Sequence, residues 1–218
     1  STNKVYGDNP NKLKLIEKKN RWELSKKNKY FRGIDEKFSI DRCTHSFFGV
    51  SKTYADLIVQ EYGKNVGLKT VSFRGGCITG PNHSAAKLHG FLSYLVKLSL
   101  KKKKYSLIGY KGKQVRDNLH SYDLVNCFWE FYKKPKKGEV YNIGGGRYSN
   151  CSIIEALDLV EKITNIKIKR EMISKPRVGD HIWYISNLSK FKKHYPNWKQ
   201  KYNTRKIIED LIDNSKKF

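Results

Sequence analysis

The chain has 218 residues, of which 38% are hydrophobic and 13% aromatic, so it can form a packed core and is not a disordered tail. No apolar run approaches the roughly 18 residues that span a membrane, and there is no signal-peptide pattern, so we expect a cytoplasmic protein without membrane contact. The formal net charge is +25. The lysines are spread along the chain, and the densest run, 101–104, is typical of a solvated turn, so we expect an anionic small substrate rather than nucleic acid.

The four cysteines show no metal-binding pattern. They form no CxxC pair, and of the four only Cys43 has a histidine, His45, at ligand spacing. We therefore expect no metal site and free thiols, as in a reducing compartment. The cysteines are Cys43, Cys77, Cys127 and Cys151.

The predicted elements alternate between strands and helices, which indicates an α/β fold. Residues 8–44 are polar and rich in lysine, and they read as a long irregular loop with one helical turn near residues 13–18. A helix with a broad apolar face follows over 48–65, and a strand over 69–74. Ser152 and Glu155 have the spacing of a capping box at the start of a later helix. Further helices are predicted over 88–100, 121–133, 153–163, 187–194 and 204–214, and strands over 105–109, 139–143 and 166–170.

Phe48 and Lys52 are the most informative residues of the chain. They are four positions apart, so on a helix they share one face. A tyrosine and a lysine at this spacing, with a hydroxyl residue such as Thr2 upstream, form an acid/base site for hydride transfer. Here phenylalanine stands at the tyrosine position, so the pattern indicates a redox-type sugar enzyme that lacks its usual proton carrier.

Two arginine-containing segments are candidates for phosphate recognition, because a guanidinium grips a phosphate through two hydrogen bonds. Residues 112–120 form a polar stretch between a strand and a helix, with Arg116 as the candidate ligand; the alternative is a loop in which Asp117 neutralises Arg116. Arg177 and Asp180 form a second Arg/Asp pair, suited to phosphate and to ribose hydroxyls. Two such loops fit a nucleoside diphosphate better than a nucleic-acid backbone.

The motifs, taken in order, resemble those of the extended short-chain dehydrogenase/reductase family, the NAD-dependent sugar-nucleotide epimerases and dehydratases. The resemblance runs from residue 1 to about 213, and the opening STNKVYGD is most similar to the CDP-paratose (CDP-tyvelose) 2-epimerase branch. The other matching segments are FGVSK at 48–52, RGGCITGP at 74–81, GKQVRDNLH at 112–120, DL at 123–124, YNIG at 141–144 and RVGD at 177–180.

The resemblance implies the C-terminal part of a Rossmann-type parallel-sheet domain joined to a small α/β substrate-binding lobe. Residues 1–80 would be the remainder of the Rossmann domain, with the irregular loop 8–44, and residues 81–218 the substrate lobe, from which about 112–145 return to the Rossmann domain. The glycine-rich βαβ units that bind the dinucleotide would precede residue 1, so we expect a chain truncated at its N-terminus. The family also implies a homodimer paired through the helix that carries Lys52.

The resemblance also implies roles for individual residues in a transient oxidation of a sugar carbon, such as C2 of a CDP-hexose, in surface-polysaccharide synthesis. Thr2, position 48 and Lys52 would be the catalytic positions. Lys52 would also bind the nicotinamide ribose of NAD, with Gly76 and Cys77 beside the nicotinamide. The substrate-binding residues would be Thr2, Asn82, His83, Arg116, Arg177 and Asp180.

Phe48 leaves the proton chemistry open, because a benzene ring neither accepts nor donates a proton, and loss of a general base costs about 10²–10⁴-fold in rate. His45, Cys77 or a water held by Thr2 and Lys52 would then take the proton, or a register shift would bring in Tyr54 or Tyr6. A catalytically weakened protein that only binds a nucleotide sugar is the alternative function.

Overall fold

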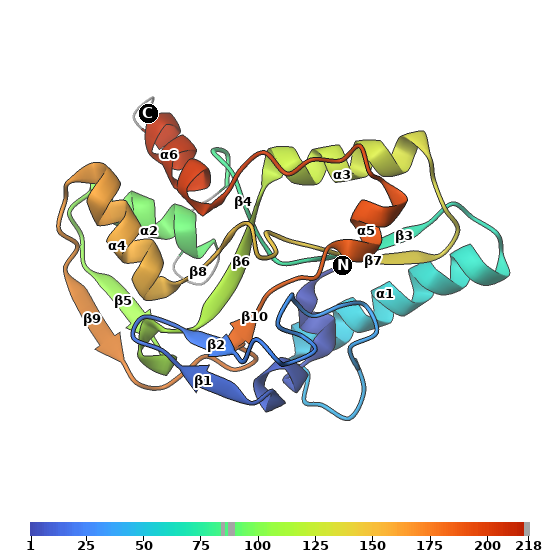
Figure 1. The fold of residues 1–218 in the computed structure, drawn as a ribbon, viewed down its shortest axis with the longest axis horizontal. Helices are drawn as coiled ribbons and strands as arrows, with labels where there is room; N and C mark the ends of the chain where they lie inside the picture. Colours follow the sequence, from blue (N-terminus) through green and yellow to red (C-terminus); the bar gives the residue numbers. More distant parts are fainter. Residues whose placement is uncertain (84–85, 87–89, 216–218) are drawn as a thin grey trace.

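The computed structural model describes residues 1–83, 86 and 90–215, and it shows an α/β fold in which two groups of helices lie around short, mostly parallel sheets (Figure 1). The first sheet pairs β3 (Val71–Gly75) in parallel with β7 (Glu139–Ile143). The long helix α1 (Phe47–Asn65) covers one face of this sheet, and α3 (Ser121–Lys133) and α5 (Ser189–His194) contribute to the core on the other.

The alternation of side chains along β3 explains this layering. Phe73 lies in an aromatic cluster with Phe128, Phe131 and Phe191 on the side of α3 and α5. The neighbouring Arg74 points to the opposite face, as period-2 geometry requires. There its guanidinium donates two hydrogen bonds to Asp56 of α1, from Nε at 3.1 Å and from Nη2 at 2.8 Å.

The strand β6 (Val115–His120) connects the two halves of the molecule, and it corrects the prediction of a loop over 112–120. It pairs in parallel with β4 (Cys77–Thr79) and β10 (Trp183–Tyr184) and antiparallel with β8 (Asn150–Ser152). All six of its residues are buried, including three polar ones in a row, Arg116, Asp117 and Asn118. Each of these polar side chains has a hydrogen-bond partner in the fold, which is why they can be buried. Because they follow one another, the sequence lacks the alternation of apolar and polar residues that normally indicates a strand.

The second group of helices encloses a separate apolar core. It contains α2 (Phe91–Leu100), α4 (Ile153–Thr164) and α6 (Thr204–Ser215), packed with β5 (Tyr105–Ile108), which pairs in parallel with β9 (Arg170–Ile173). The predicted capping box of α4 is confirmed, since Ser152 Oγ accepts from the Glu155 amide at 3.0 Å and Glu155 Oε2 from the Ser152 amide at 2.9 Å. The strand predicted at 166–170 begins only at residue 170, because the Ile168 amide donates to the Glu161 carboxylate instead of to a strand.

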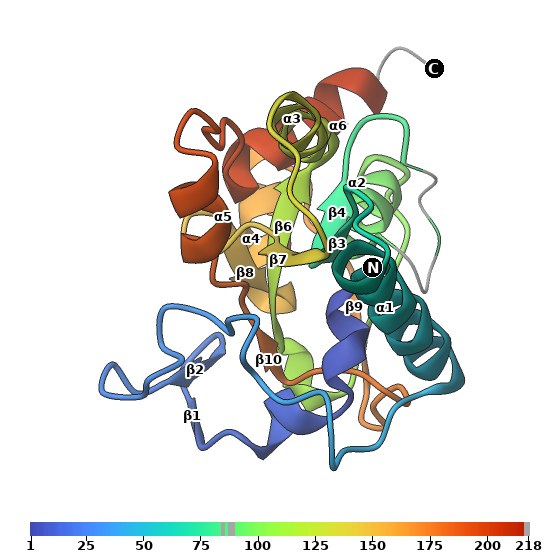
Figure 2. The same ribbon diagram turned by 90° about the vertical axis from the view of Figure 1, so that its right-hand side faces the viewer.

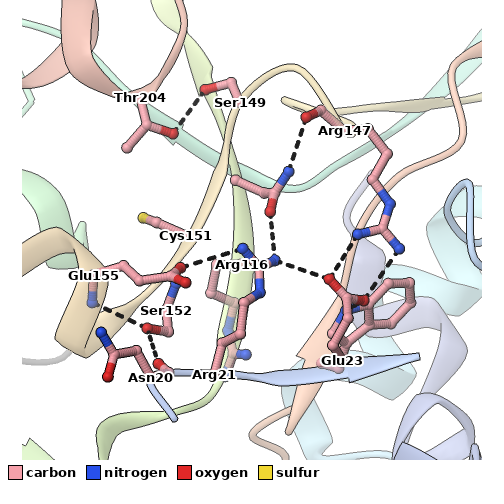
Figure 3. A network of polar contacts seen from close by, with 12 residues as sticks. Asn20, Arg21, Glu23, Arg116, Arg147, Ser149, Cys151, Ser152, Glu155 and Thr204 are labelled. Carbon is pink, nitrogen blue, oxygen red and sulfur yellow. Dashed lines mark hydrogen bonds and ion pairs between the residues drawn. The ribbon is translucent and has the colours of Figure 1, made fainter. Parts of the chain in front are cut away.

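Most of the segment 8–44 is irregular, as predicted, but the helical turn predicted near 13–18 is wrong, because a strand occupies those positions. It contains the 3₁₀ turn η2 (Asn9–Lys12) and an antiparallel hairpin of β1 (Leu15–Glu17) and β2 (Trp22–Leu24). Two arginines fix the hairpin (Figure 3): Arg21 pairs with Glu23 and Glu155, and Arg147 with Glu23. Leu24 is buried in a third core, beside η1 (Asn3–Tyr6) and β10.

The turn expected at 101–104 lies where the sequence predicts it, and the helix before it begins slightly later than predicted. The run 101–104 is an exposed turn after α2, and η3 (Tyr110–Gly112) precedes β6. The start of the helix predicted over 88–100 falls partly outside the described residues, and α2 begins at Phe91. Among described residues, no helix has the length and apolar character needed to cross a membrane. All four cysteines are free thiols, and no metal-binding group of three His, Cys, Asp or Glu occurs in 1–83, 86 and 90–215.

Candidate functional site

The first turn of α1 presents Phe48 and Lys52 on one exposed face, as their spacing predicts. The helix begins after Ser46, whose Oγ accepts a hydrogen bond from the Gly49 amide at 3.1 Å and so caps the N-terminus. Lys52 Nζ lies 5.6 Å from the centroid of the Phe48 ring. Phe48 is 54% exposed, so this ring faces open space rather than the core.

Thr2 lies beside this turn of α1. The backbone of Thr2 forms a parallel bridge with Gly75 at the end of β3, and the hydroxyl of the adjacent Ser1 donates to Asp56 at 2.5 Å. Asp56 is one helical turn beyond Lys52, so residues 1–2 run along the same stretch of α1. Both Figure 1 and Figure 2 show the N-terminus between α1 and the sheet. The structure thus brings Thr2 close to the Phe48/Lys52 face.

Gly76 and Cys77 follow directly, at the point where the chain passes from β3 to β4. A Cβ at position 76 would clash with Asp117 Oδ1, so a larger residue there would displace this buried carboxylate. Burial raises the pKa of the Cys77 thiol to about 11. Cys77 therefore stays protonated at neutral pH and offers no thiolate base.

Arg116 and Asp180 meet in a buried ion pair, which brings the two predicted phosphate-binding segments together. Arg116 Nη2 lies 2.5 Å from Asp180 Oδ1, and the side chains are 8% and 9% exposed. Arg177 lies 3.9 Å from the other carboxylate oxygen. The alternative in which Asp117 neutralises Arg116 is wrong, because Asp117 Oδ2 instead accepts the amides of Gly146 and Ser186.

The electrostatics of this cluster favour an ionised Asp180. Burial alone would raise its pKa, but the charges of Arg116, Lys4 and Arg177 outweigh that effect and hold the pKa of Asp180 below its ordinary value. Asp117, without such a cation beside it, has a pKa raised to about 6 by burial, which the two backbone donors only partly offset.

Two residues that the sequence analysis did not select hold the loop that carries Asp180. The side-chain amide of Asn11, in η2, donates to Asp180 O at 2.9 Å and accepts from the Ile182 amide at 2.7 Å. The Lys4 ammonium donates to Gly179 O at 2.8 Å. Asparagine and lysine are abundant in this chain, and only the fold sets these two apart from the rest.

Three further predicted residues differ in how accessible their side chains are to a ligand: His45, Asn82 and His83. His45 Nε2 is 2.8 Å from Val5 O, so this nitrogen carries the proton and donates to the backbone. Asn82 is exposed, and His83 is partly buried, with Nδ1 3.4 Å from Ser93 Oγ. The chain just after them, at 84–85 and 87–89, lies outside the described residues.

The residues present fit one part of the cofactor that the resemblance implies. Lys52 is exposed, and no carboxylate of the described residues lies within 4.0 Å of its ammonium, so its three donors are available for the hydroxyls of a nicotinamide ribose. The fit is therefore to the ribose next to the nicotinamide. The glycine-rich turn that holds a pyrophosphate has no counterpart in this sequence.

The chain is similar in sequence to curated enzymes that act on nucleotide sugars. The chain is 29% identical to the CDP-paratose 2-epimerase of Salmonella typhi over 98% of its own length and 62% of that protein. It is 33% identical to the dTDP-D-glucose 4,6-dehydratase of Dictyostelium discoideum over 56% of the chain and 26% of that protein. The chain thus spans about three-fifths of the length of the epimerase that it matches almost throughout.

Solved structures show the same fold. The dTDP-glucose 4,6-dehydratase of Bacillus anthracis, in complex with NAD, matches with a TM-score of 0.76 and 25% identity over all of this chain and 60% of that one. The UDP-glucuronic acid 4-epimerase of Bacillus cereus, with UDP-glucuronic acid and NAD, has a TM-score of 0.72 and 21% identity over the same shares. The family model described as "NAD dependent epimerase/dehydratase family" matches residues 25–144. The chain therefore belongs to the NAD-dependent epimerase/dehydratase family.

Proposed function

We propose that the protein is an NAD-dependent nucleotide-sugar epimerase that inverts C2 of a CDP-hexose. The observation that carries the proposal is the convergence of Arg116 with Asp180 and Arg177, three residues from two distant segments that fit a diphosphate and a ribose. The similarity to the CDP-paratose 2-epimerase of Salmonella typhi over nearly the whole chain supports the choice of base and carbon. The reaction would serve surface-polysaccharide synthesis in the cytoplasm.

In this proposal the residues along α1 hold the reacting end of the substrate. Thr2 hydrogen-bonds the sugar hydroxyl, and Lys52 binds the nicotinamide ribose. Gly76 and Cys77 line the space next to the nicotinamide. When bound, NAD would supply the hydride acceptor and donor chemistry. The residues of this chain orient the sugar and the nicotinamide ribose toward each other. The proximity of Thr2 to the turn of α1 that carries Lys52 supports these roles.

The second group of residues holds the nucleotide. Arg116 grips the diphosphate, and Arg177 with Asp180 takes phosphate charge and ribose hydroxyls. Asn82 and His83 face the substrate from the loop after β4. The buried setting of Arg116 supports its role, because a guanidinium away from bulk water binds phosphate with less screening.

Phe48 favours a second candidate, a catalytically weakened protein that binds the nucleotide sugar without ordinary turnover. The ring stands where the catalytic phenol is expected, and His45 Nε2 is already bonded to the backbone. Replacing tyrosine by phenylalanine leaves ligand binding possible in a fold neighbour: a tyrosine-to-phenylalanine variant of the Bacillus cereus epimerase is seen with UDP-4-deoxy-4-fluoro-glucuronic acid and NAD.

One experiment separates the two candidates. CDP-glucose binding is measured by titration calorimetry, and NMR then follows inversion at C2 in the presence of NAD. Saturable binding with inversion supports the epimerase, and binding without inversion supports the weakened relative. Absence of binding refutes both. The variant Arg116→Met should lose binding, whereas Arg205→Met, which removes an exposed arginine paired with Glu209, should not.

We also propose a homodimer that pairs through α1. Several large apolar side chains of this helix are exposed in the chain, including Leu57 at 45% and Tyr54 at 69%. A contiguous apolar face of this kind is typical of an interface. Light scattering on the purified protein and on Leu57→Lys tests it, because a charge at the centre of the interface should yield monomers.

A further inference from the structure

The ammonium of Lys4 is a partly buried cation without a matching anion. Its one acceptor among the described residues is Gly179 O, at 2.8 Å, so two of its three N–H donors have no protein partner. Of the carboxylates that the structure describes, none lies within 4.0 Å of Lys4 Nζ. A charge removed from water in this way is unfavourable unless an anion compensates it.

The surroundings of Lys4 add positive charge rather than removing it. Arg116 in β6 and Arg177 in the loop after β9 both act on it electrostatically, and Asp180 is already bonded to Arg116 and close to Arg177. The other titratable groups that face it are neutral at pH 7: burial raises the pKa of the Cys77 thiol and lowers that of His181 far below its ordinary value. Three cations thus lie around the Asp180 carboxylate, and an anionic ligand would offset this excess of positive charge.

The position of Lys4 says which part of a ligand it meets. Lys4 is two residues after Thr2 in the same 3₁₀ turn, and the Thr2 hydroxyl accepts from the Lys4 amide at 3.3 Å. Gly179, to which the ammonium is bonded, lies against Ser46, the residue that caps α1. Lys4 therefore stands between the sugar end of the site, marked by Thr2 and α1, and the phosphate end, marked by Arg116.

We propose that Lys4 is a substrate-binding residue whose ammonium contacts the diphosphate of a nucleotide sugar on its sugar side, completing a cluster with Arg116 and Arg177. This inference rests on the proposed function and adds a residue to that site. On binding, the two free N–H donors of Lys4 would bond phosphate oxygens, and the diphosphate would supply the negative charge that the cluster lacks.

The same geometry makes the contact sensitive to pH. Burial, reinforced by Arg116, lowers the pKa of Lys4 to about 8, so the residue loses its charge at a pH where the arginines keep theirs. The diphosphate of a nucleotide sugar is a diester and keeps its two charges throughout this range. Affinity should therefore be high below the pKa of Lys4 and fall as the pH rises through it.

The test is calorimetric titration of CDP-glucose at about pH 6.5 and about pH 9.5, with the wild type, Lys4→Met and Lys4→Arg. We expect the wild type to bind about tenfold or more weakly at the higher pH. Lys4→Met should bind about 10- to 100-fold more weakly than the wild type at the lower pH, and Lys4→Arg should bind with no pH dependence. Lys12→Met, which removes an exposed lysine paired with Asp8, should behave as the wild type.

The outcomes separate the two proposals. If the wild type binds CDP-glucose with the same affinity at both pH values, or if Lys4→Met binds as well as the wild type, the role of Lys4 is refuted and the proposed function stands. If the wild type binds no CDP-glucose at all, both are refuted. Should Lys4→Met not fold, the comparison of Lys4→Arg with the wild type still decides, since only a titrating Lys4 gives them different pH profiles.

Discussion

The buried pair of Arg116 and Asp180 allows a quantitative test of how the phosphate-binding cluster is held together. The pair has an N···O distance of 2.5 Å, and its side chains are less than a tenth exposed. Replacing Asp180 by Asn removes the carboxylate that pairs with the buried Arg116, and uncompensated buried charge costs about 3–5 kcal/mol. Arg116→Met should cost less, about 2–3 kcal/mol, because Asp180 keeps Arg177 at 3.9 Å.

A double-mutant cycle measures the interaction itself. Free energies of unfolding are taken from urea denaturation at pH 7, followed by tryptophan fluorescence, for the wild type, the two single variants and the double variant. The double variant should be less destabilised than the sum of the single variants by about 2–3 kcal/mol. The exposed pair Arg205–Glu209, at 3.1 Å, serves as the control cycle and should show a coupling below about 0.5 kcal/mol.

The pH dependence of the free energy of unfolding tests the Arg116–Asp180 pair independently. Since the folded-state pKa of Asp180 is lowered, its stabilising effect is present above the unfolded-state value of about 3.9 and is lost as the pH falls through the folded-state value. The difference in stability between the wild type and Asp180→Asn should therefore shrink in acid. Additive single effects, or a difference that stays constant into acid, would refute the account of a strong buried pair.

Three further predictions concern other parts of the structure. Phe48→Tyr should raise the rate of C2 inversion about 10²- to 10⁴-fold if position 48 limits the chemistry, whereas Phe47→Tyr, at a side chain 97% exposed, should leave the rate unchanged. Asp56→Asn should lower the free energy of unfolding in urea by about 3–5 kcal/mol, because Arg74 loses its bidentate partner. Burial raises the pKa of Asp56, but Arg74 lowers it more strongly, so that it lies below its ordinary value. The difference in stability between Asp56→Asn and the wild type should therefore vanish in strong acid, where Asp56 is protonated. Arg147→Ala should release the β1–β2 hairpin, which limited proteolysis within residues 15–24 would detect well below the midpoint of global unfolding.

The parts of the fold that the sequence predicted are those whose partners are local. The helix over 121–133, the strand over 139–143 and the capping box at Ser152 depend on periodicity and on neighbours within four residues, and all three are confirmed. In the same way, the spacing of Phe48 and Lys52 was enough to place them on one helix face.

The parts that the sequence did not predict depend on partners far along the chain. Arg116 and Asp117 make a strand look like a polar loop, because Asp180, which pairs with Arg116, and the Ser186 amide, which donates to Asp117, are more than 60 residues away. Lys4 became distinctive only when the fold placed it beside two arginines. The catalytic and binding roles of the individual residues stay predictions. The same holds for the division into two domains at residues 80–81.

The hairpin β1–β2 also has a consequence for the order in which the chain folds. Its charged contacts join residues far apart in sequence: Glu155 comes 134 positions after Arg21, and Arg147 comes 124 positions after Glu23. Contacts of such long range close large loops and are made slowly. On the ribosome the hairpin leaves the exit tunnel long before the residues that hold it are made. Its ordering must therefore be a late event of biogenesis, and until the residues that hold them are made these two strands stay open to proteases and chaperones.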